Sequence, residues 1–345
     1  MTHLAALGER IDKPLLVTNL VNVKYLVGFE SSNAALLVQP GGDTTLYTDF
    51  RYAEAAKAVD GVEVVMTKRS LLGDVASRLS GSVQFESSAV SHASWKELSS
   101  GSAELVPVTG VVEGLRAVKS EDEVAKIKRA AQIADRAFEA LTAETFVGRS
   151  EREVAWRLRE LLHAHGSDAL SFESIVASGP NGALPHGRPT DKIIAPGELV
   201  TVDWGCGFEG YYSDSTRTVS TGGISDRLRE IYEVCLRAQV AACEGLRAGV
   251  TGVDGDALAR DVIEAAGYGG EFGHGLGHGL GLEVHEAPTL STASTYPLEP
   301  GNVVTVEPGI YLPGVGGVRI EDDVVVRENG VELLTSFPKQ LIEVR

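Results

Sequence analysis

The sequence of 345 residues is poor in cysteine and contains no continuous apolar run of 18 residues. Its three cysteines, Cys206, Cys235 and Cys243, form no Cys-x-x-Cys pair, which argues for reduced thiols and against a disulfide scaffold. The opening residues MTHLAALGERIDK lack the apolar core of a signal peptide. We therefore expect a protein without a membrane span, located in the cytoplasm.

Positive charge is also scarce, because 31 Lys and Arg residues stand against 48 Asp and Glu residues, giving a formal net charge of −17. Nucleic acids and anionic membrane surfaces select patches of Lys and Arg. The charge balance therefore argues against both kinds of partner. The hydrophobic content of 43% is that of a folded globular protein, and the length allows two domains.

Several common catalytic motifs are missing. The glycines of GHGLGHGLG do not fit the dinucleotide pattern G-x-G-x-x-G, and no G-x-S-x-G is present. The segment that ends at Gly187 continues with Arg188-Pro189 and lacks the Lys-Ser/Thr of a phosphate loop. His285-Glu286 is not followed by the second histidine of a zincin helix. The chemistry must therefore lie in other residues.

The chain divides near residue 115. Residues 1–114 alternate short apolar runs with helical patterns, which is typical of a small α/β domain, and they contain no catalytic cluster. The boxes Ser120-x-x-Glu123 and Ser150-x-x-Glu153 each predict a helix N-terminus and open a second domain, residues 119–345. In the first domain we expect helices at 52–58, 71–79 and 91–98 and strands at 15–18, 33–38, 44–48, 62–66 and 83–86.

One phrase of the second domain occurs twice. PGELVTVD ends at Asp203 and PGNVVTVE ends at Glu307, and five of their eight positions are identical. Each copy runs through apolar β-forming residues into one carboxylate. A buried carboxylate without a partner is prohibitively costly, so each acid requires either an Arg or Lys or a metal ion. The repeat suggests two related halves that direct acid-tipped strands toward a shared centre.

Three further residues favour the metal. Asp214 and Glu321 lie on the strands expected to return beside each repeat after a Pro/Gly turn, and His278 lies between them among glycines. Four carboxylates and one imidazole suit a pair of Mn²⁺, Zn²⁺ or Co²⁺ ions about 3.5–4 Å apart, which share a nucleophilic hydroxide at neutral pH. A Ca²⁺ site remains an alternative that the histidine disfavours.

These five residues and their flanking motifs point to a known family. The motifs are SGPNGALPHG, VDWGCGFEGYYSDSTRT, GHGLGHGLGLEVHE, VEPGIY and VRIED. Together they resemble the pita-bread metallopeptidases, which include aminopeptidase P, prolidase, methionine aminopeptidase and the metal-free creatinase. The resemblance covers essentially the whole chain. It implies an α+β fold, in which a smaller creatinase-like α/β N-terminal domain precedes a pseudo-twofold pita-bread domain. It also implies that the pita-bread domain binds two divalent metal ions, of which Mn²⁺ is the first expectation and Zn²⁺ or Co²⁺ the alternatives.

The resemblance also implies a role for each metal-binding residue. Asp203 would chelate one ion, His278 and Glu307 the other, and Asp214 and Glu321 would bridge them. Glu307 matches the proposed general base, although a carboxylate that already binds a metal is a weak base.

Other residues are candidates for substrate contact. By resemblance, His186 would steady the scissile group and His285 would hydrogen-bond its carbonyl oxygen. His274 matches a histidine near the proline subsite. Arg319 would either support the acidic cluster or contact substrate, and Tyr212 is a candidate for the pocket wall.

Taken together, these features lead us to expect an Xaa-Pro aminopeptidase, which releases an N-terminal residue that precedes proline through a hydroxide bridging two metal ions. The alternative is an Xaa-Pro dipeptidase (prolidase). Prolidases often carry an arginine just after the HExP motif, where this chain has Thr289, and this departure favours longer peptides. Arg188 and Arg319 are candidates to substitute for that arginine, which keeps the dipeptidase as the alternative. A catalytically silent binding module and a creatinase-like hydrolase are weaker alternatives, since no metal ligand is missing. The family implies a homodimer.

Overall fold

The structure is a computed structural model that describes residues 2–345. The chain forms two compact units, of which the first ends at Arg116 and the second is Ala117–Arg345. None of the helices in the described residues combines the length and apolarity that a bilayer-spanning helix requires.

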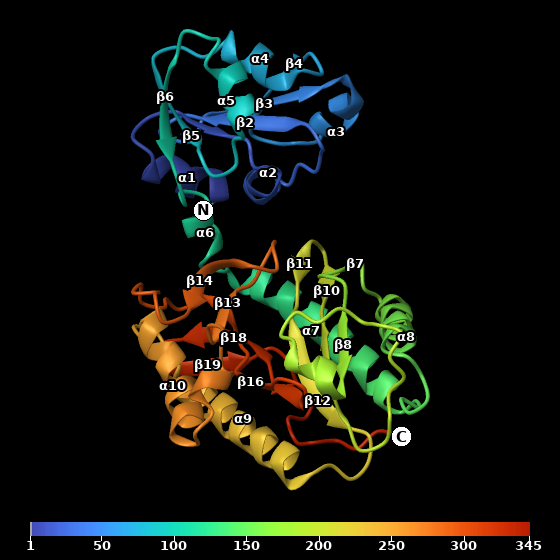
Figure 1. Cartoon of the computed structure of the whole chain (residues 1–345). Helices are drawn as coiled ribbons and strands as arrows, with labels where there is room; N and C mark the ends of the chain where they lie inside the picture. Colours follow the sequence, from blue (N-terminus) through green and yellow to red (C-terminus); the bar gives the residue numbers. More distant parts are fainter. Residues whose placement is uncertain (1) are drawn as a thin grey trace. The chain divides into compact units, whose positions relative to one another are not determined.

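The first unit is built on one mixed sheet with the strand order β4-β3-β2-β1-β5-β6 (Figure 1). β1 pairs antiparallel with β2 and parallel with β5, so a meander and parallel crossovers share the sheet. The strands are β1 (Leu15–Val17), β2 (Ala34–Val38), β3 (Thr44–Asp49), β4 (Glu63–Thr67), β5 (Ser82–Glu86) and β6 (Glu104–Val108). The helices are α1 (His3–Arg10), α2 (Leu20–Val27), η1 (Phe50–Tyr52), α3 (Ala53–Ala56), α4 (Leu71–Ala76), α5 (His92–Leu98) and α6 (Glu113–Arg116).

The first unit differs from the sequence-based expectation at several elements. α1, α2 and β6 were not expected, and the helices expected at 52–58 and 71–79 are shorter. The reason is clearest for α2, whose N-terminus depends on a distant residue. The buried carboxylate of Glu86 accepts hydrogen bonds from the backbone N–H groups of Thr18 and Asn19, at 2.7 and 2.8 Å. A helix that is fixed by a tertiary contact leaves only a weak local pattern.

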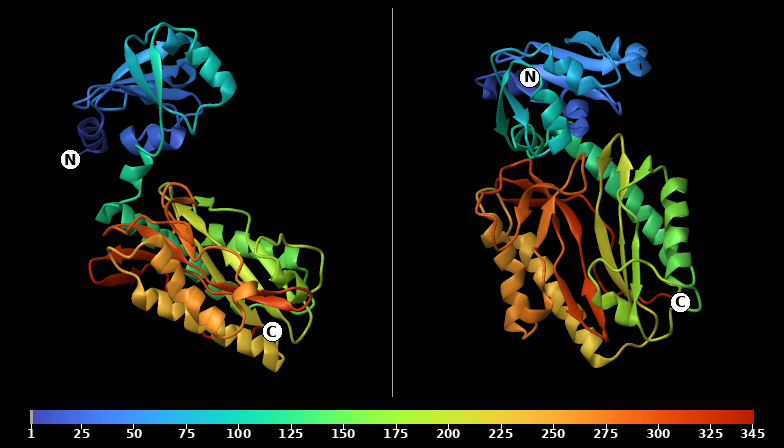
Figure 2. Two further views of the ribbon diagram at one scale, coloured as in Figure 1. Left: turned by 60° about the vertical axis from the view of Figure 1, so that its left-hand side comes forward. Right: turned by 45° about the horizontal axis from the view of Figure 1, so that its top comes forward.

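The second unit consists of two similar halves with helices on the outside and strands between them (Figures 1 and 2). Its helices are α7 (Glu121–Thr142), α8 (Glu151–Ala164), η2 (Gly179–Ala183), α9 (Asp226–Gly245), α10 (Gly252–Ala265) and η3 (Gly269–Glu271). Both predicted capping boxes are confirmed, at Ser120 for α7 and at Ser150 for α8. Each serine accepts from the backbone N–H three residues later, and that glutamate accepts from the serine N–H in return.

The first half carries the first copy of the repeat in an antiparallel sheet of order β12-β9-β8. One face of this sheet is covered by α7 and α8, through Phe138 and Leu158, which pack with Val202 and Trp204 in one core. The strands of this half are β7 (Ala169–Leu170), β8 (Ile175–Ser178), β9 (Leu199–Trp204), β10 (Cys206–Phe208), β11 (Tyr211–Tyr212) and β12 (Ser215–Ser220).

The second half repeats this plan. Its five-stranded sheet has the order β14-β13-β15-β18-β19, and α9 and α10 pack on it through Ile231 and Ile263. Its strands are β13 (Gly277–Gly279), β14 (Glu286–Leu290), β15 (Val303–Val306), β16 (Gly309–Leu312), β17 (Gly316–Arg319), β18 (Asp322–Arg327) and β19 (Gly330–Leu333).

The C-terminal segment, residues 335–345, follows the second half in sequence but packs on the first. The ring of Phe337 lies 4.8 Å from that of Phe138 on α7, and Val344 is buried in the core of the first half. Glu343 bridges to Ser220 at the end of β12. The segment therefore connects the two halves.

Candidate metal centre and active site

Both copies of the repeat become central strands, and each delivers one carboxylate to the space between the halves. Asp203 lies in β9 opposite Thr216 of the antiparallel β12, and Asp214 directly precedes β12. Glu307 directly follows β15, and Glu321 directly precedes β18, which pairs antiparallel with β15. The two hairpins therefore present their acids at equivalent places.

The two hairpins contact each other through Thr216 and Glu321. The backbone N–H of Glu321 donates to the carbonyl of Thr216 at 3.0 Å, and the Thr216 hydroxyl donates to Glu321 Oε2 at 2.7 Å. This reciprocal pair fixes the distance between a strand of one half and the acid of the other.

Three of the predicted ligands meet in one cluster. Ligand atoms of Asp214, His278 and Glu321 lie within 4.8 Å of one another, a spacing that could hold a metal ion. Nε2 of His278 is 3.8 Å from Asp214 Oδ2 and 3.3 Å from Glu307 Oε1. Asp203 is not part of this cluster, but it is near enough for its charge to act on Asp214, Glu307 and Glu321.

The ionised forms of the carboxyl groups in this cluster are strongly disfavoured when no cation is bound. Burial raises the pKa of Asp214 well above its usual value, and the carboxylates of Glu321 and Asp203 raise it further. Burial and the neighbouring Glu307 and Asp203 do the same for Glu321. Burial raises the pKa of Glu307 to about 7 and lowers that of His278 to about 4. Cations beside these carboxyl groups would therefore be needed to keep all of them ionised.

The polar atoms left over in the cluster fit a metal ion. Oδ2 of Asp203 accepts a hydrogen bond from Nη2 of Arg319 at 2.6 Å, whereas its buried Oδ1 has no partner in the described residues. A buried carboxylate oxygen without a partner is costly, and coordination to a cation would satisfy it. Oxygen donors with one imidazole suit divalent ions such as Mn²⁺, Zn²⁺ and Co²⁺.

Arg319 is occupied by the protein itself. Its Nε donates to the Thr216 hydroxyl, its Nη1 to the Pro185 carbonyl and to the Tyr311 hydroxyl, and its Nη2 to Asp203. Its side chain is almost fully buried. The structure therefore places Arg319 against the acidic cluster, as support for Asp203, and not toward open solvent.

His274 and Tyr311 extend this network. Nδ1 of His274 is 2.8 Å from the carbonyl oxygen of Gly275, and its Nε2 is 2.9 Å from the Tyr311 hydroxyl. Burial lowers the pKa of His274 to about 4 and raises that of Tyr311 to about 12. Tyr311 was not among the residues predicted from sequence, since GIYL reads as an ordinary buried strand.

Two exposed histidines flank the cluster. The centroid of the His285 ring lies 4.2 Å from that of His278, and a protonated His186 would lower the pKa of Asp203. Tyr212 is half-buried, and its backbone N–H donates to the carbonyl of Gly281 in the same loop as His285. The predicted substrate-contacting residues therefore surround the predicted ligands.

A buried ion pair supports the loop that carries His285. Nζ of Lys119 lies 2.6 Å from Oε1 of Glu286, and both side chains are at most 5% exposed. The two residues are separated by 167 positions in the chain, so no local pattern marks the pair. It was not predicted from sequence.

A glycine brings the His278 strand close to β15. A Cβ atom added to Gly277 would lie 2.0 Å from the carbonyl oxygen of Thr305, far inside van der Waals contact. The hydroxyl of Thr305 accepts from the His278 N–H at 3.1 Å and donates to Glu307 Oε1 at 3.1 Å. Gly277 thus permits the approach that links His278 to the strand before Glu307.

Comparisons with known proteins identify the family of each part of the chain. Residues 125–328 match the description of metallopeptidase family M24, and residues 4–118 match the creatinase/prolidase N-terminal domain. A Xaa-Pro dipeptidase of Pyrococcus furiosus is 38% identical over 338 residues, which cover 96% of this chain and 95% of that protein.

Solved structures resemble the whole chain. The Xaa-Pro dipeptidase from Bacillus anthracis has a TM-score of 0.95 at 41% identity, covering 99% of both chains. The X-Pro aminopeptidase from Thermotoga maritima has a TM-score of 0.89 at 37% identity, covering 98% of this chain and 99% of that one.

Proposed function

This chain belongs to metallopeptidase family M24, and from that premise we propose that it hydrolyses the peptide bond of Xaa-Pro dipeptides. It is a metal-dependent hydrolase, and its expected α+β fold, with a pita-bread C-terminal domain and a creatinase-like N-terminal domain, is confirmed. The sequence alone favoured an aminopeptidase acting on longer peptides. That preference is not confirmed, because the named relatives support the dipeptidase alternative better.

The observation that carries the proposal is the convergence of acids from two hairpins on His278. Asp214 and Glu321 share a 4.8 Å cluster with it, and Glu307 Oε1 is 3.3 Å away. Asp203 adds a buried oxygen without a partner among residues 2–345. These five residues would hold two divalent ions, with Mn²⁺ as our first choice and Zn²⁺ or Co²⁺ as alternatives. Bound there, such ions act as Lewis acids and activate water for attack at neutral pH.

The chain's own side chains would then orient the substrate. Proline forms a tertiary amide without an N–H, which general peptidases handle poorly. His285, exposed beside His278, would donate a hydrogen bond to the scissile carbonyl, where negative charge develops, and the exposed His186 would steady the scissile group. Glu307 would accept the proton of the attacking water. His274 and Tyr212 would line the pocket.

The test is hydrolysis after chelation and reloading. We expect Ala-Pro to be cleaved when Mn²⁺, Co²⁺ or Zn²⁺ is returned to the metal-free protein, whereas Ala-Ala should be a poor substrate. Elemental analysis should find about two ions per chain in the active sample. No metal-dependent release of alanine from any proline-containing peptide would reject the proposal, and Asp214→Asn serves as the inactive control.

One observation favours a second candidate, an Xaa-Pro aminopeptidase. Thr289 is the strand partner of His278, so its side chain faces the site, yet it offers no positive charge for a dipeptide's carboxylate. Faster hydrolysis of Ala-Pro-Ala than of Ala-Pro would favour this candidate.

We also propose a homodimer, as the family resemblance implies. Sedimentation equilibrium of the full chain should give twice the mass of one chain, and a monomer that remains fully active would contradict it.

A further inference from the structure

A dipeptidase must distinguish its substrate by the end that follows proline. An Xaa-Pro dipeptide ends in a carboxylate one residue beyond the scissile bond, whereas a longer peptide has a neutral amide there. A cation at that distance would therefore favour dipeptides over longer peptides. Neither Thr289 nor Arg319 supplies it, since Thr289 is uncharged and Arg319 already makes four hydrogen bonds within the protein.

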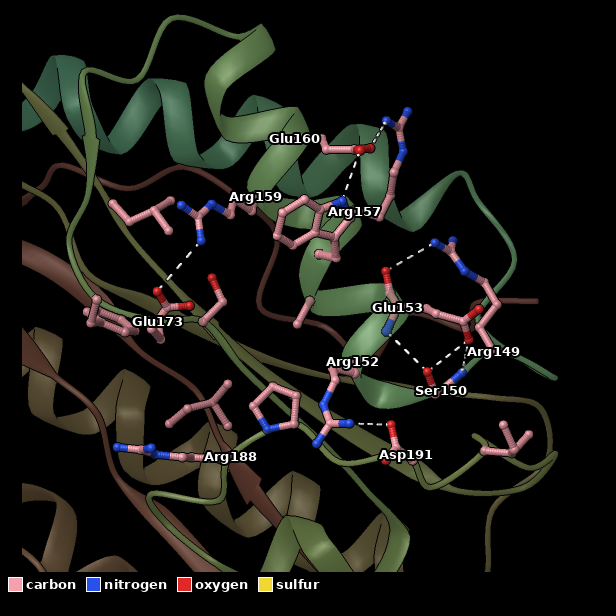
Figure 3. A pocket seen from close by; sticks show the side chains of 18 of the residues that line it. Arg149, Ser150, Arg152, Glu153, Arg157, Arg159, Glu160, Glu173, Arg188 and Asp191 are labelled. Atoms are coloured by element: carbon pink, nitrogen blue, oxygen red, sulfur yellow. Dashed lines mark hydrogen bonds and ion pairs between the residues drawn. The ribbon is translucent and has the colours of Figure 1, made fainter.

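A cavity of about 1310 Å³ that includes His186 in its lining offers other cations (Figure 3). It lies between α8 and the segment from His186 to Ile193, and none of the five predicted metal ligands lines it. Its lining does include His186, so it adjoins the site at that residue. The lining also includes five arginines, namely Arg149, Arg152, Arg157, Arg159 and Arg188.

Four of the five arginines are already neutralised. Arg149 and Arg157 pair with Glu144, and Arg157 also pairs with Glu160. Arg152 pairs with Asp191, and Arg159 lies 3.7 Å from Glu173.

Arg188 differs from these four. Within residues 2–345 it makes no ion pair and no side-chain hydrogen bond, and it is exposed. Figure 3 shows its guanidinium directed away from the pair of Arg152 and Asp191. It is the one arginine of this cavity whose charge is available to a ligand.

The turn that carries Arg188 is held by a residue of the candidate active site. Two residues earlier, the exposed ring of His186 follows Pro185, whose carbonyl accepts a hydrogen bond from Arg319 at 3.0 Å. The buried Gly187 closes a turn through its N–H to the carbonyl of Leu184, also at 3.0 Å. One short turn therefore presents both His186 and Arg188 and is anchored to the residue that holds Asp203.

We propose that Arg188 binds the α-carboxylate of the dipeptide. The inference rests on the proposed function and names the residue that recognises the C-terminal end of the substrate. In the protein, the backbone positions of His186 and Arg188 are two residues apart and so at most about 7 Å from each other. In the substrate, the single proline separates the scissile carbonyl from the carboxylate by roughly 4 Å. Because the arginine side chain is long and flexible, His186 can contact the scissile group while Arg188 contacts the carboxylate. A guanidinium also offers two parallel N–H groups, which match a carboxylate.

The experiment compares two substrates that differ only in this charge, Ala-Pro and Ala-Pro-amide, on the metal-loaded enzyme. We expect Arg188→Met to raise KM for Ala-Pro by about tenfold or more, with kcat little changed, because a charge-assisted hydrogen bond is lost. Hydrolysis of Ala-Pro-amide should be unaffected. Arg188→Lys should restore part of the KM, because it returns the charge without the fork.

The matched control is Arg152→Met, which removes another arginine from the same cavity but one that is already paired with Asp191. Arg152→Met should leave KM and kcat unchanged for both substrates. The proposal is overturned if Arg188→Met leaves KM for Ala-Pro unchanged or slows the hydrolysis of Ala-Pro and Ala-Pro-amide equally. It is also overturned if Arg152→Met raises KM for Ala-Pro as much as Arg188→Met does.

Failure of the inference can be separated from failure of the proposed function. If the parent enzyme cleaves neither Ala-Pro nor its amide with any metal, the proposed function fails. Calorimetric binding of Ala-Pro to the metal-free protein then tests Arg188 independently of catalysis. Equal binding by the parent and Arg188→Met would contradict our assignment, whereas weaker binding by the variant alone would support it.

Discussion

At the scale of single residues, the site depends on buried charges that are paired across long stretches of chain. Lys119 with Glu286 and Arg319 with Asp203 both join positions more than a hundred residues apart. A buried pair of this kind adds little net stability when intact, but removing one member takes an opposite charge away from the other inside the protein. Mutations at these residues should therefore have large and asymmetric effects.

The pair under the His285 loop gives the first prediction. We expect Lys119→Met to lower the free energy of unfolding by about 1.5–3 kcal/mol, because the buried carboxylate of Glu286 loses the charge-assisted hydrogen bond of the Lys119 ammonium. Urea unfolding followed by circular dichroism measures this. Lys128→Met, which breaks an exposed pair with Glu332, is the control and should cost less than about 1 kcal/mol. Equal costs for the two variants would contradict the prediction.

Tyr311 gives the second prediction. Its hydroxyl lies between Nη1 of Arg319 and Nε2 of His274, at 3.0 and 2.9 Å. Tyr311→Phe would leave both groups without this partner in a buried place, at a cost of about 1–3 kcal/mol in unfolding free energy. Tyr296→Phe, at a residue that is 78% exposed, should change nothing measurable. A Tyr311→Phe protein as stable as its parent would show that the hydroxyl is dispensable.

At the scale of elements, the sequence predicts what is set locally. The boxes at Ser120 and Ser150 determine where α7 and α8 begin, and the repeated PGxxVTV phrase becomes the paired strands β9 and β15. Helix α2 was missed because LVNVKYLV alternates like a strand and its start depends on the distant Glu86.

The same distinction applies to the site. The predicted ligands Asp214, His278 and Glu321 do meet in one cluster, and Glu307 lies beside them, since their positions follow from strand ends. The contact of Tyr311 with His274 and the pair of Lys119 with Glu286 join residues 37 and 167 positions apart. Only the packed fold creates such contacts, so a single sequence cannot predict them.

Strand packing around His278 gives the third prediction. Gly277→Ala would place a methyl group against the Thr305 carbonyl and force β13 away from β15, displacing His278. We expect weaker Mn²⁺ binding by calorimetry together with a lower melting temperature. Gly223→Ala is the control, because a Cβ at Gly223 meets nothing within 4 Å. Unchanged Mn²⁺ affinity in Gly277→Ala would be the contrary result.

At the scale of the whole molecule, two halves with separate cores share one acidic centre. The first half supplies Asp203 and Asp214, and the second supplies His278, Glu307 and Glu321. The carboxylates of the two halves raise one another's pKa, as Glu321 does for Asp214. Without cations, the packing of the halves must therefore work against this repulsion.

Metal removal gives the fourth prediction. A ligand at 100 times its Kd stabilises the folded state by about 2.7 kcal/mol, so chelation should lower the melting temperature by roughly 5–10 °C. Differential scanning calorimetry before and after chelation measures the shift. The double variant Asp214→Asn, Glu321→Gln should show no response to the chelator. A parent protein whose melting temperature ignores chelation would argue against ions in this cluster.

The crossing of the C-terminal segment restricts how this unit can move. Residues 335–345 leave the second half and pack the buried Val344 and the partly buried Phe337 against the first. A clamshell motion that parts the halves would have to extract these side chains, at about 1.5–3 kcal/mol for each one that is fully exposed to water. The segment thus acts as a tether that opposes wide separation of the two halves, so a peptide must reach the ions while the halves stay together.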